Sequence, residues 1–182
     1  AQLGLKTACI EKEYLGGVCL NVGCIPSKAM ISATHFLHKA QHDAAEMGIN
    51  IKGISVDMKQ LKKWKESVTN KMSGGVGQLL KGNGVTTLMG TAEFKSKTEI
   101  TLKSKDGSDT ITAKHFIIAT GSKIALPDIK NLENVPYHTP RTILDVMRPP
   151  KSIFIVGGGT EAIEIAQLLA IFGTKVYISE IS

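Results

Sequence analysis

The sequence predicts an α/β protein in which short strands alternate with helices. The clearest sign lies near the end of the chain, where the strand-like run Ser152–Val156 leads through three glycines into a helical pattern over Glu161–Phe172. A second strand-like run, Lys175–Ser179, follows this helix directly. A strand, a glycine turn, a helix and a second strand in this order are typical of the β-α-β unit of a parallel sheet.

The first half of the chain predicts a strand followed by a long helix. The apolar run Lys6–Glu11 ends in an acid and indicates a short buried strand. Before it, Ala1–Leu3 is expected to be the end of a helix that Gly4 caps. A glycine-bearing turn then leads into a helix that we expect to extend through Ala29–Met47.

Asp57 is expected to cap a second helix over Met58–Leu80, although three glycines weaken that helix internally. After it, the continuous apolar run His115–Ala119 predicts another buried strand. Between them, alternating runs predict four short strands, with a hairpin turn at residues 106–107. These strands are Val85–Met89, Thr91–Lys95, Glu99–Lys103 and Asp109–Ala113.

A domain boundary is expected in the segment Ser122–Pro150, which carries five of the six prolines and no strong periodicity. Connectors between domains often have this composition. We therefore expect residues 1–122 to form a first domain, 123–150 a linker and 151–182 the start of a second domain.

Composition narrows the classes of partner. The net charge is +6, but the lysines are scattered among acids, and aromatic residues make up only 5% of the chain. This pattern argues against a nucleic-acid partner, since few aromatic rings are available to stack on bases. No apolar run is long enough to cross a bilayer, so no membrane partner is expected. Three cysteines favour redox or metal chemistry over a structural disulfide framework.

Cys19 and Cys24 lie five residues apart at the predicted start of a helix. In an ideal helix, a rise of about 1.5 Å per residue separates them by more than about 7 Å along the axis, beyond the reach of a relaxed disulfide. A bond between them would need a distorted helix, for which Gly23 and Pro26 supply the means, and its strain would favour a redox role. Spacing alone favours two buried structural cysteines, and half of a zinc site is a further alternative.

The thirteen residues from Gly16 to Lys28 resemble the redox-active signature of the pyridine nucleotide-disulfide oxidoreductases. The resemblance also covers the strand that ends in Glu11, the segment Ala119–Ser122 and the turn Gly157–Gly159, all in the same order. It implies a FAD-binding Rossmann-like domain of the three-layer ββα type, followed by the start of a second Rossmann-like domain that binds NAD.

The resemblance also implies the catalytic residues. Cys19 would exchange with a dithiol substrate, and Cys24 would face the flavin and form a thiolate–flavin charge-transfer pair. Lys28 would lie beside the reactive edge of the flavin, where an ammonium group stabilises negative charge. Glu164 would pair with Lys28 across the domain junction. Without the resemblance, Glu164 is interpreted as an ordinary exposed helix residue.

The second nucleotide site is predicted from the glycine turn and the acid that follows the next strand. The run from Gly157 to Ala162 fits the pattern G-x-G-x-x-A of a dinucleotide-binding turn. Glu180 stands where an acid binds the adenosine ribose and repels a 2′-phosphate, which favours NAD over NADP; a solvated strand end is the alternative. The cofactor contacts expected here are Gly157, Gly158, Gly159, Ala162, Glu164 and Glu180.

Only part of the FAD site is expected within these residues, because the family's own glycine turn for FAD has no counterpart in them. Val18 stands where the family usually has threonine, which removes one hydroxyl contact. The residues that the resemblance assigns to FAD are Glu11, Gly16, Gly17, Val18, Cys19, Lys28, Ala92, Thr120, Gly121 and Ser122.

The ending Cys-Ile-Pro-Ser-Lys is most similar to the family members that oxidise protein-bound dihydrolipoamide and pass the electrons through FAD to NAD⁺. This similarity implies, as partner, a lipoyl-bearing acyl-carrier protein of a 2-oxoacid dehydrogenase or glycine cleavage complex. It also implies a homodimer; separately from the resemblance, we expect a cytoplasmic location. A mercuric or glutathione reductase-like flavoenzyme and a non-catalytic truncated module are alternatives. We expect the chain to be inactive alone, because the family's C-terminal interface domain has no counterpart in it.

Overall fold

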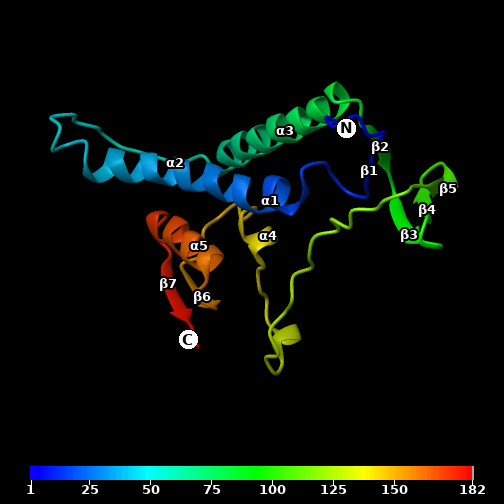
Figure 1. Ribbon diagram of the computed structural model, residues 1–182. Coiled ribbons are helices and arrows are strands. Elements are labelled where there is room, and N and C mark those ends of the chain that lie inside the picture. The colour runs from blue at the N-terminus through cyan, green and yellow to red at the C-terminus, as the bar shows by residue number, and fades with distance from the viewer. Residues whose placement is uncertain (182) are drawn as a thin grey trace. The chain divides into compact units, whose positions relative to one another are not determined.

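The computed structural model describes residues 1–181 (Figure 1); Ser182, the last residue of the predicted second domain, lies outside the described residues. Two compact units are present. The first unit combines Ala1–Val18 with Asn70–Lys123, and the second combines Cys19–Thr69 with the chain from Ile124 onward. Helix α3 (Met58–Gly82) contributes its first half to the second unit and its second half to the first.

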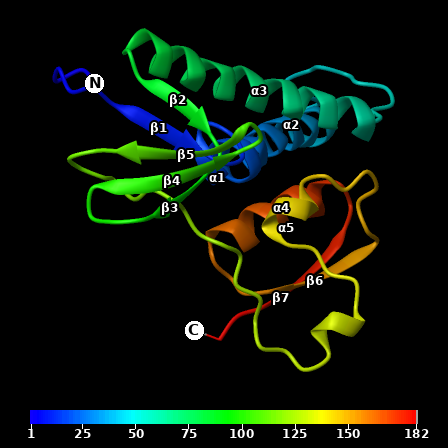
Figure 2. The ribbon, with the colours of Figure 1, turned by 90° about the vertical axis from the view of Figure 1, so that its right-hand side faces the viewer.

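The first unit contains a parallel pair of strands (Figure 2). β1 (Ala8–Glu11) pairs in parallel with β2 (Thr86–Met89), with Cys9 opposite Thr87. The strands predicted at Lys6–Glu11 and Val85–Met89 are therefore confirmed, although β1 is only partly buried. A parallel pair needs a long connection, and here the connection returns through α3 before β2 begins.

An antiparallel meander completes the first unit. β3 (Thr91–Phe94) pairs with β4 (Glu99–Ser104), which pairs with β5 (Gly107–Thr112). Alternation along β4 buries Ile100 and Leu102, which are 4% and 5% exposed. The four strands predicted between residues 85 and 113 are thus confirmed with ends shifted by one or two residues.

Glycine is required where β2 turns into β3. A Cβ atom at Gly90 would lie 2.5 Å from the carbonyl oxygen of Lys103, so no larger residue fits. The amide of Gly90 donates to the carbonyl of Glu11 at 2.8 Å, which extends the parallel pair by one hydrogen bond. This hydrogen bond holds the end of β1, where Glu11 lies.

Helix α3 continues through the three glycines that were expected to weaken it. The hydroxyl of Ser73, a residue of α3, donates to the carbonyl of Leu15 at 2.9 Å. A Cβ atom at Gly77 would lie 3.5 Å from the Leu15 side chain, so this position packs against the segment before α1. Each glycine costs a helix about 1 kcal/mol relative to alanine, whereas the contacts of Ser73 and Gly77 with Leu15 stabilise this part of α3.

Two sequence predictions in the first unit are wrong. Residues 1–4 form a turn rather than the end of a helix, with Gly4 donating to the carbonyl of Ala1 at 2.8 Å. His115–Ala119 is not a strand, because no strand among the described residues pairs with it, and Ile117 and Ile118 are 94% and 71% exposed. Apolar composition alone predicted pairing for this segment, but pairing also needs a neighbour.

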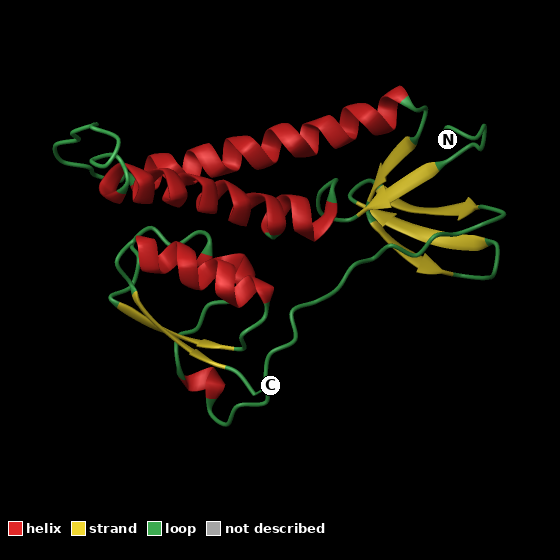
Figure 3. Ribbon diagram, turned by 60° about the vertical axis from the view of Figure 1, so that its left-hand side comes forward, coloured by secondary structure: helices red, strands yellow, loops and turns green. Residues whose placement is uncertain are grey.

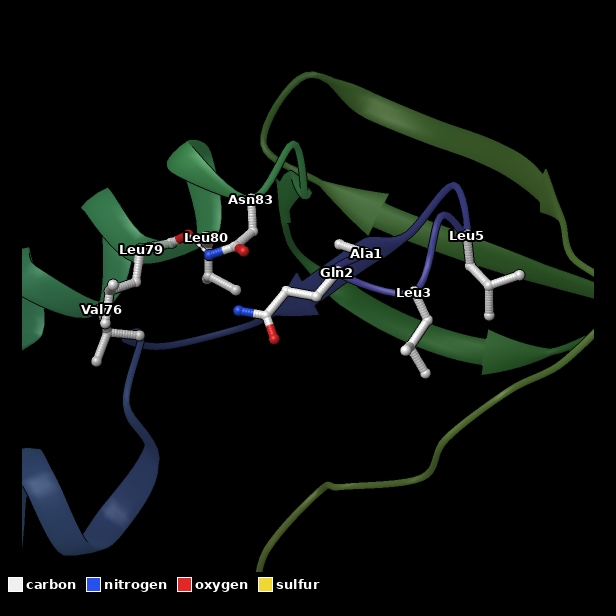
Figure 4. Close-up of a pocket in the computed structure, with 8 residues that line it drawn as sticks. All are labelled: Ala1, Gln2, Leu3, Leu5, Val76, Leu79, Leu80 and Asn83. Carbon is white, nitrogen blue, oxygen red and sulfur yellow. Dashed lines mark hydrogen bonds between the residues drawn. The ribbon is translucent and has the colours of Figure 1, made fainter.

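An open apolar hollow of about 460 Å³ lies between the N-terminal turn and the end of α3 (Figure 4). Its apolar lining includes Leu3, Leu5 and Leu79, and the first two of these side chains are 93% and 69% exposed. None of the residues assigned to the flavin or to the redox centre lines it.

The second unit contains the predicted β-α-β unit. β6 (Ser152–Val156) and β7 (Lys175–Ser179) pair in parallel, with Val156 opposite Ser179. Helix α5 (Thr160–Ile171) connects them and covers one face of the pair (Figure 3). Both strand predictions are confirmed to the residue, and the helix prediction is shifted by one residue at each end.

Helix α5 also packs against α2 (Cys24–His42), as Figure 1 shows. The buried cluster between the elements of this unit consists of Met30, Ile143, Leu144, Leu168 and Leu169. Ile143 is the last residue of the short helix α4 (Pro140–Ile143), and Leu144 follows it directly. The 3₁₀ turn η1 (Leu132–Asn134) lies before α4. Two apolar side chains of α2, Met30 and Leu37, are buried.

The end of α2 differs from the prediction. The helix stops at His42 rather than Met47, and the amide of Ala44 then donates to the carbonyl of Lys39 at 3.0 Å. In this turn Ala44 is buried, with 5% exposure. Gly48, with φ of 78°, ends the turn that follows.

A buried lysine links α3 to the end of α4. The predicted cap is confirmed, because the carboxylate of Asp57 accepts from the amide of Gln60 at 3.0 Å. Farther along α3, Lys65 is 5% exposed, whereas Trp64 beside it is 41% exposed. Lys65 Nζ donates to the carbonyl of Leu144 at 3.0 Å and to the carboxylate of Asp145.

The pKa of Asp145 lies below its ordinary value. Partial burial raises this pKa, but the hydrogen bond and positive charge of Lys65, helped by Lys62, lower it further than burial raises it. Since the folded-state pKa is the lower one, the ion pair stabilises the fold above the unfolded-state pKa. The stabilisation disappears as the pH falls through the folded-state pKa.

We expect Asp145→Ala to lower the free energy of unfolding at neutral pH by about 1–2 kcal/mol, because it leaves the Lys65 ammonium with one carbonyl partner. Lys65→Met removes the buried charge itself and is expected to cost less. Urea denaturation measures both, and the deficit of Asp145→Ala should shrink at acidic pH. Equal destabilisation by the two variants would contradict this interpretation.

Candidate redox site

The cysteine pair lies where one helix ends and the next begins. α1 (Gly17–Val22) contains Cys19, and Cys24 is the first residue of α2. The two sulfurs form a disulfide, and their Cα atoms are 4.6 Å apart. Gly23 between the helices has φ of −132° and ψ of −107°, far from helical values, so the predicted distortion is confirmed. Both cysteines are exposed, which excludes two buried structural cysteines.

The break comes from Gly23 and not from Pro26. Proline in the first turn of a helix removes an amide that has no partner in the helix, and its fixed φ suits the helical backbone. Pro26 is buried at the third position of α2 and leaves the helix intact. The first return hydrogen bond of the new helix runs from the amide of Ser27 to the carbonyl of Gly23 at 3.0 Å.

One turn after Cys24, two side chains of α2 contact the same carboxylate on α5. Lys28 Nζ donates to Oε1 of Glu164, forming an ion pair. The hydroxyl of Ser27 lies 3.2 Å from the other oxygen, Oε2, and 3.0 Å from the carbonyl oxygen of Cys24. The pairing of Lys28 with Glu164 that the resemblance implies is therefore present, while its role in catalysis stays a prediction.

This contact lowers the pKa of Glu164 below the ordinary value for glutamate. The hydrogen bond from Lys28 is the largest cause, partial burial opposes it, and the hydrogen bond from Ser27 and the charge of Lys28 add to the lowering. Glu164 is therefore ionised at neutral pH. The Lys28 side chain remains 57% exposed, so its ammonium is available to a further anionic group.

The geometry favours a thiolate at Cys24. Its position at the N-terminus of α2 places it at the positive end of the helix dipole. Lys28 lies four residues farther along, on the same face of the helix. Cys19 is the third residue of the short helix α1 and has no lysine one turn farther along that helix. An attacking thiol therefore breaks the disulfide most readily at Cys19, with Cys24 as the leaving group.

The glycine turn after β6 meets the acid after β7. Gly157 has φ of 100°, which glycine adopts without strain, and its amide donates to the carbonyl of Ser179 at 2.8 Å. The amide of Gly158 donates to the carboxylate of Glu180. A Cβ atom at Gly158 would lie 3.0 Å from that carboxylate, so a larger residue there would require the Glu180 side chain to shift.

Neither the backbone conformation nor the packing of the chain requires a glycine at Gly159. Its φ is −68°, and a Cβ atom there would touch nothing within 4 Å. The G-x-G-x-x-A pattern assigns this position to close approach by a pyrophosphate, and the open space at the start of α5 fits that group. Ala162 is half-buried in the first turn of α5. These residues fit the adenosine half of a dinucleotide.

The residues assigned to FAD in the first unit fit only part of that cofactor. Glu11 ends β1, and its carboxylate accepts from the amide of Glu13 at 2.8 Å, which holds the acid at the strand end. Gly16 and Gly17 have φ of 95° and 68°, and the space beside Gly17 is open. Consecutive amides in this conformation suit an anionic or polar group. Val18 is 39% exposed.

The remaining assigned residues are exposed. Ala92 lies on β3, where it faces Leu102 across the ladder. Thr120, Gly121 and Ser122 lie in an extended segment without regular structure. Their assigned roles toward FAD stay predictions. Among residues 1–181, no group of three or more His, Cys, Asp or Glu side chains gathers as metal ligands. Cys19 and Cys24, the pair of the zinc alternative, are joined in a disulfide.

Ser27 is the residue of this site that sequence reasoning missed. It lies inside the cysteine signature and directly before Lys28, but serine at this place has no recognisable pattern of its own. Its spacing of three residues from Cys24 predicts a shared helix face. Its contact with Glu164 spans 137 positions in the sequence, and no local pattern indicates it.

Comparisons with known proteins agree with this geometry. A family model described as "Pyridine nucleotide-disulphide oxidoreductase" matches residues 1–182. The chain is 45% identical over 181 residues to the dihydrolipoyl dehydrogenase of Geobacillus stearothermophilus, covering 99% of this chain and 38% of that protein. It is 37% identical over 183 residues to the mitochondrial dihydrolipoyl dehydrogenase of Schizosaccharomyces pombe, covering 99% and 36%. The chain thus spans well under half the length of these curated relatives.

Solved structures show the same fold. The Escherichia coli HOCl-induced flavoprotein disulfide reductase RclA, solved as a Cu(II) complex, matches with a TM-score of 0.79 at 26% identity, over 98% of this chain and 37% of that one. LpdA of Mycobacterium tuberculosis matches in fold with a TM-score of 0.84 at 20% identity, over 95% and 38%. Since the family model matches every residue and the fold agrees, this chain belongs to the pyridine nucleotide-disulphide oxidoreductase family.

Proposed function

We propose that the protein containing this chain is a flavoenzyme that oxidises protein-bound dihydrolipoamide to lipoamide and passes the electrons to NAD⁺. The observation that carries this proposal is the exposed Cys19–Cys24 disulfide at the start of α2, one turn from the Lys28–Glu164 pair. Dihydrolipoyl dehydrogenases are the relatives that match the chain at 45% and 44% identity. Their name supplies the substrate class.

The dithiol reaction begins with exchange at Cys19. One substrate thiolate forms a bond to the sulfur of Cys19, the bond between Cys19 and Cys24 breaks, and Cys24 keeps the electron pair as a thiolate. The second substrate thiolate then attacks the substrate sulfur of the mixed disulfide. Cys19 leaves as a thiolate and takes up a proton. The substrate is thereby oxidised to a disulfide, and the cysteine pair is reduced by two electrons.

Charge placement around Cys24 controls the second half of the cycle. Bound FAD would supply the two-electron acceptor that restores the disulfide, and NAD⁺ would receive the electrons as a hydride. Lys28 holds a positive charge on the same helix face as Cys24, where it stabilises negative charge that develops beside it. Glu164 holds that ammonium in place and belongs to α5, the helix that follows the dinucleotide turn.

Glu180 selects the nicotinamide cofactor in this proposal. Its carboxylate accepts from the amides of Gly158 and Ile181, which places it beside the glycine turn, and ribose hydroxyls are donors that a carboxylate accepts. A 2′-phosphate at the same place would meet a negative charge, so NAD is preferred to NADP. This preference argues against a glutathione reductase-like cofactor choice.

The same proposal covers the partner, the oligomeric state and the location of the protein. The partner is a lipoyl-bearing acyl-carrier protein of a 2-oxoacid dehydrogenase or glycine cleavage complex, the assembly is a homodimer and the location is the cytoplasm. We also propose that residues 1–122 form a first domain, 123–150 a linker and 151–182 the start of a second domain. This division is supported by the β-α-β unit from Ser152 to Ser179. None of the helices in the described part of the chain is long and apolar enough to cross a membrane.

The roles of the two cysteines are tested by trapping a mixed disulfide. Incubated with oxidised lipoamide, the Cys24→Ser variant should accumulate a lipoyl adduct on Cys19, because the resolving thiol is absent. The Cys19→Ser variant should accumulate roughly ten-fold less adduct on Cys24 at equilibrium, because a stabilised thiolate is the better leaving group and is readily displaced from the mixed disulfide. Intact-mass spectrometry measures both, with Cys9→Ser as the control. Preferential adduct formation on Cys24 would reverse the assignment.

The cofactor preference is tested at Glu180. Glu180→Gln keeps an oxygen that accepts the Gly158 amide but removes the charge. We therefore expect its NADP affinity, relative to NAD, to rise by roughly ten-fold, about 1.4 kcal/mol. Isothermal titration with the protein that contains this chain measures the ratio, and Glu133→Gln, an exposed acid on η1, is the matched control. An unchanged ratio would place the discrimination elsewhere.

A further inference from the structure

Ser27 stands between the cysteine that starts α2 and the acid on α5. The residue is 8% exposed, and its hydroxyl oxygen lies 3.0 Å from the carbonyl oxygen of Cys24 and 3.2 Å from Oε2 of Glu164. Lys28, the next residue, contacts the other oxygen of the same carboxylate. Glu164 is therefore held at both oxygens by two adjacent side chains of one helix.

The hydroxyl of Ser27 has one hydrogen and two acceptors within reach. An ionised carboxylate is the stronger acceptor, and a charge-assisted hydrogen bond is roughly twice as strong as a neutral one. With Glu164 ionised, the hydrogen therefore points to Oε2. Were Glu164 to take up a proton, its own hydroxyl would donate to Ser27, and Ser27 would turn to donate to the carbonyl of Cys24.

We propose that Ser27 is a positioning residue of the redox site, which holds Oε2 of Glu164 so that Oε1 stays directed at Lys28. The inference rests on the proposed function for its consequence, since a fixed ammonium on the face of Cys24 is what the reduced pair requires. Its geometric content concerns only residues of α2 and α5. Ser27 does not touch the substrate in this account; it acts through Glu164 and Lys28.

The competing interpretation is local. Serine in a helix often bonds the carbonyl three or four residues earlier, and the contact from Ser27 to Cys24 has that form. In that case the hydroxyl contributes nothing to Glu164, and its removal changes only the first turn of α2. The two interpretations therefore differ in what happens to the ionisation of a carboxylate on another helix.

The test compares Ser27→Ala with Ser32→Ala. Ser32 lies on the same helix and is exposed, so it controls for the change of residue type. Carboxyl-resonance NMR of the chain follows the titration of Glu164 in each variant. We expect Ser27→Ala to raise the pKa of Glu164 and Ser32→Ala to leave it unchanged. Glu161, one turn earlier on α5, is retained in all variants, so its influence on the titration of Glu164 is the same in each.

Ser27→Thr retains the hydroxyl and is the rescue variant. We expect it to return the titration of Glu164 toward the wild-type midpoint. In the reduced chain, the alkylation rate of Cys24 at neutral pH should fall roughly two- to ten-fold in Ser27→Ala, because a loosened ammonium stabilises the thiolate less. A merely structural role for the hydroxyl moves neither quantity.

One result overturns the inference: a Glu164 titration in Ser27→Ala that coincides with the wild type while far-ultraviolet circular dichroism shows the helices intact. If Ser27→Ala loses helix, the Ser27→Thr variant decides. A wild-type titration of Glu164 in Ser27→Thr supports the inference, and a raised pKa of Glu164 in that variant with intact helices opposes it. Neither measurement needs FAD or a dithiol substrate. A failure here therefore leaves the proposed function standing, and a failed lipoamide trap leaves this inference standing.

Discussion

The disulfide between Cys19 and Cys24 requires a break in the helix, and the redox site is arranged around that break. An unbroken helix would hold the two Cα atoms too far apart, whereas here they are 4.6 Å apart across Gly23. The break makes Cys24 the first residue of a new helix, at its positive end. It also sets the direction of α2, whose first turn carries Ser27 and Lys28 to the carboxylate of Glu164.

Charge is used in two different ways in the second unit. The Lys65–Asp145 pair joins α3 to the end of α4, with the ammonium buried and satisfied by a carbonyl and a carboxylate. The Lys28–Glu164 pair leaves its ammonium more than half exposed. The buried ammonium of Lys65, bonded to a carbonyl and a carboxylate, holds α3 against the end of α4. The exposed ammonium of Lys28, close to a reactive sulfur, can stabilise a negative charge that develops there.

Local patterns predicted the elements whose formation depends on neighbours in sequence. The β-α-β unit over residues 152–179 and the cap at Asp57 follow from periodicity and turn chemistry, and both are confirmed. The errors arise where a distant neighbour decides. His115–Ala119 is apolar but has no pairing strand among the described residues, and α2 ends at His42, after which a turn buries Ala44. Apolar composition does not reveal which partner is available.

The sequence by itself determined the chemistry of the site: two cysteines at a spacing that a straight helix cannot bridge, and a glycine turn followed one strand later by an acid. Only the tertiary structure decided which side chains serve them. Ser27 and Lys28 meet Glu164 across 137 and 136 positions of sequence. Helical spacing predicts which residues share a face, but the packing of α2 against α5 decides which faces meet, and that packing depends on burial of a shared core around Met30 and Leu168.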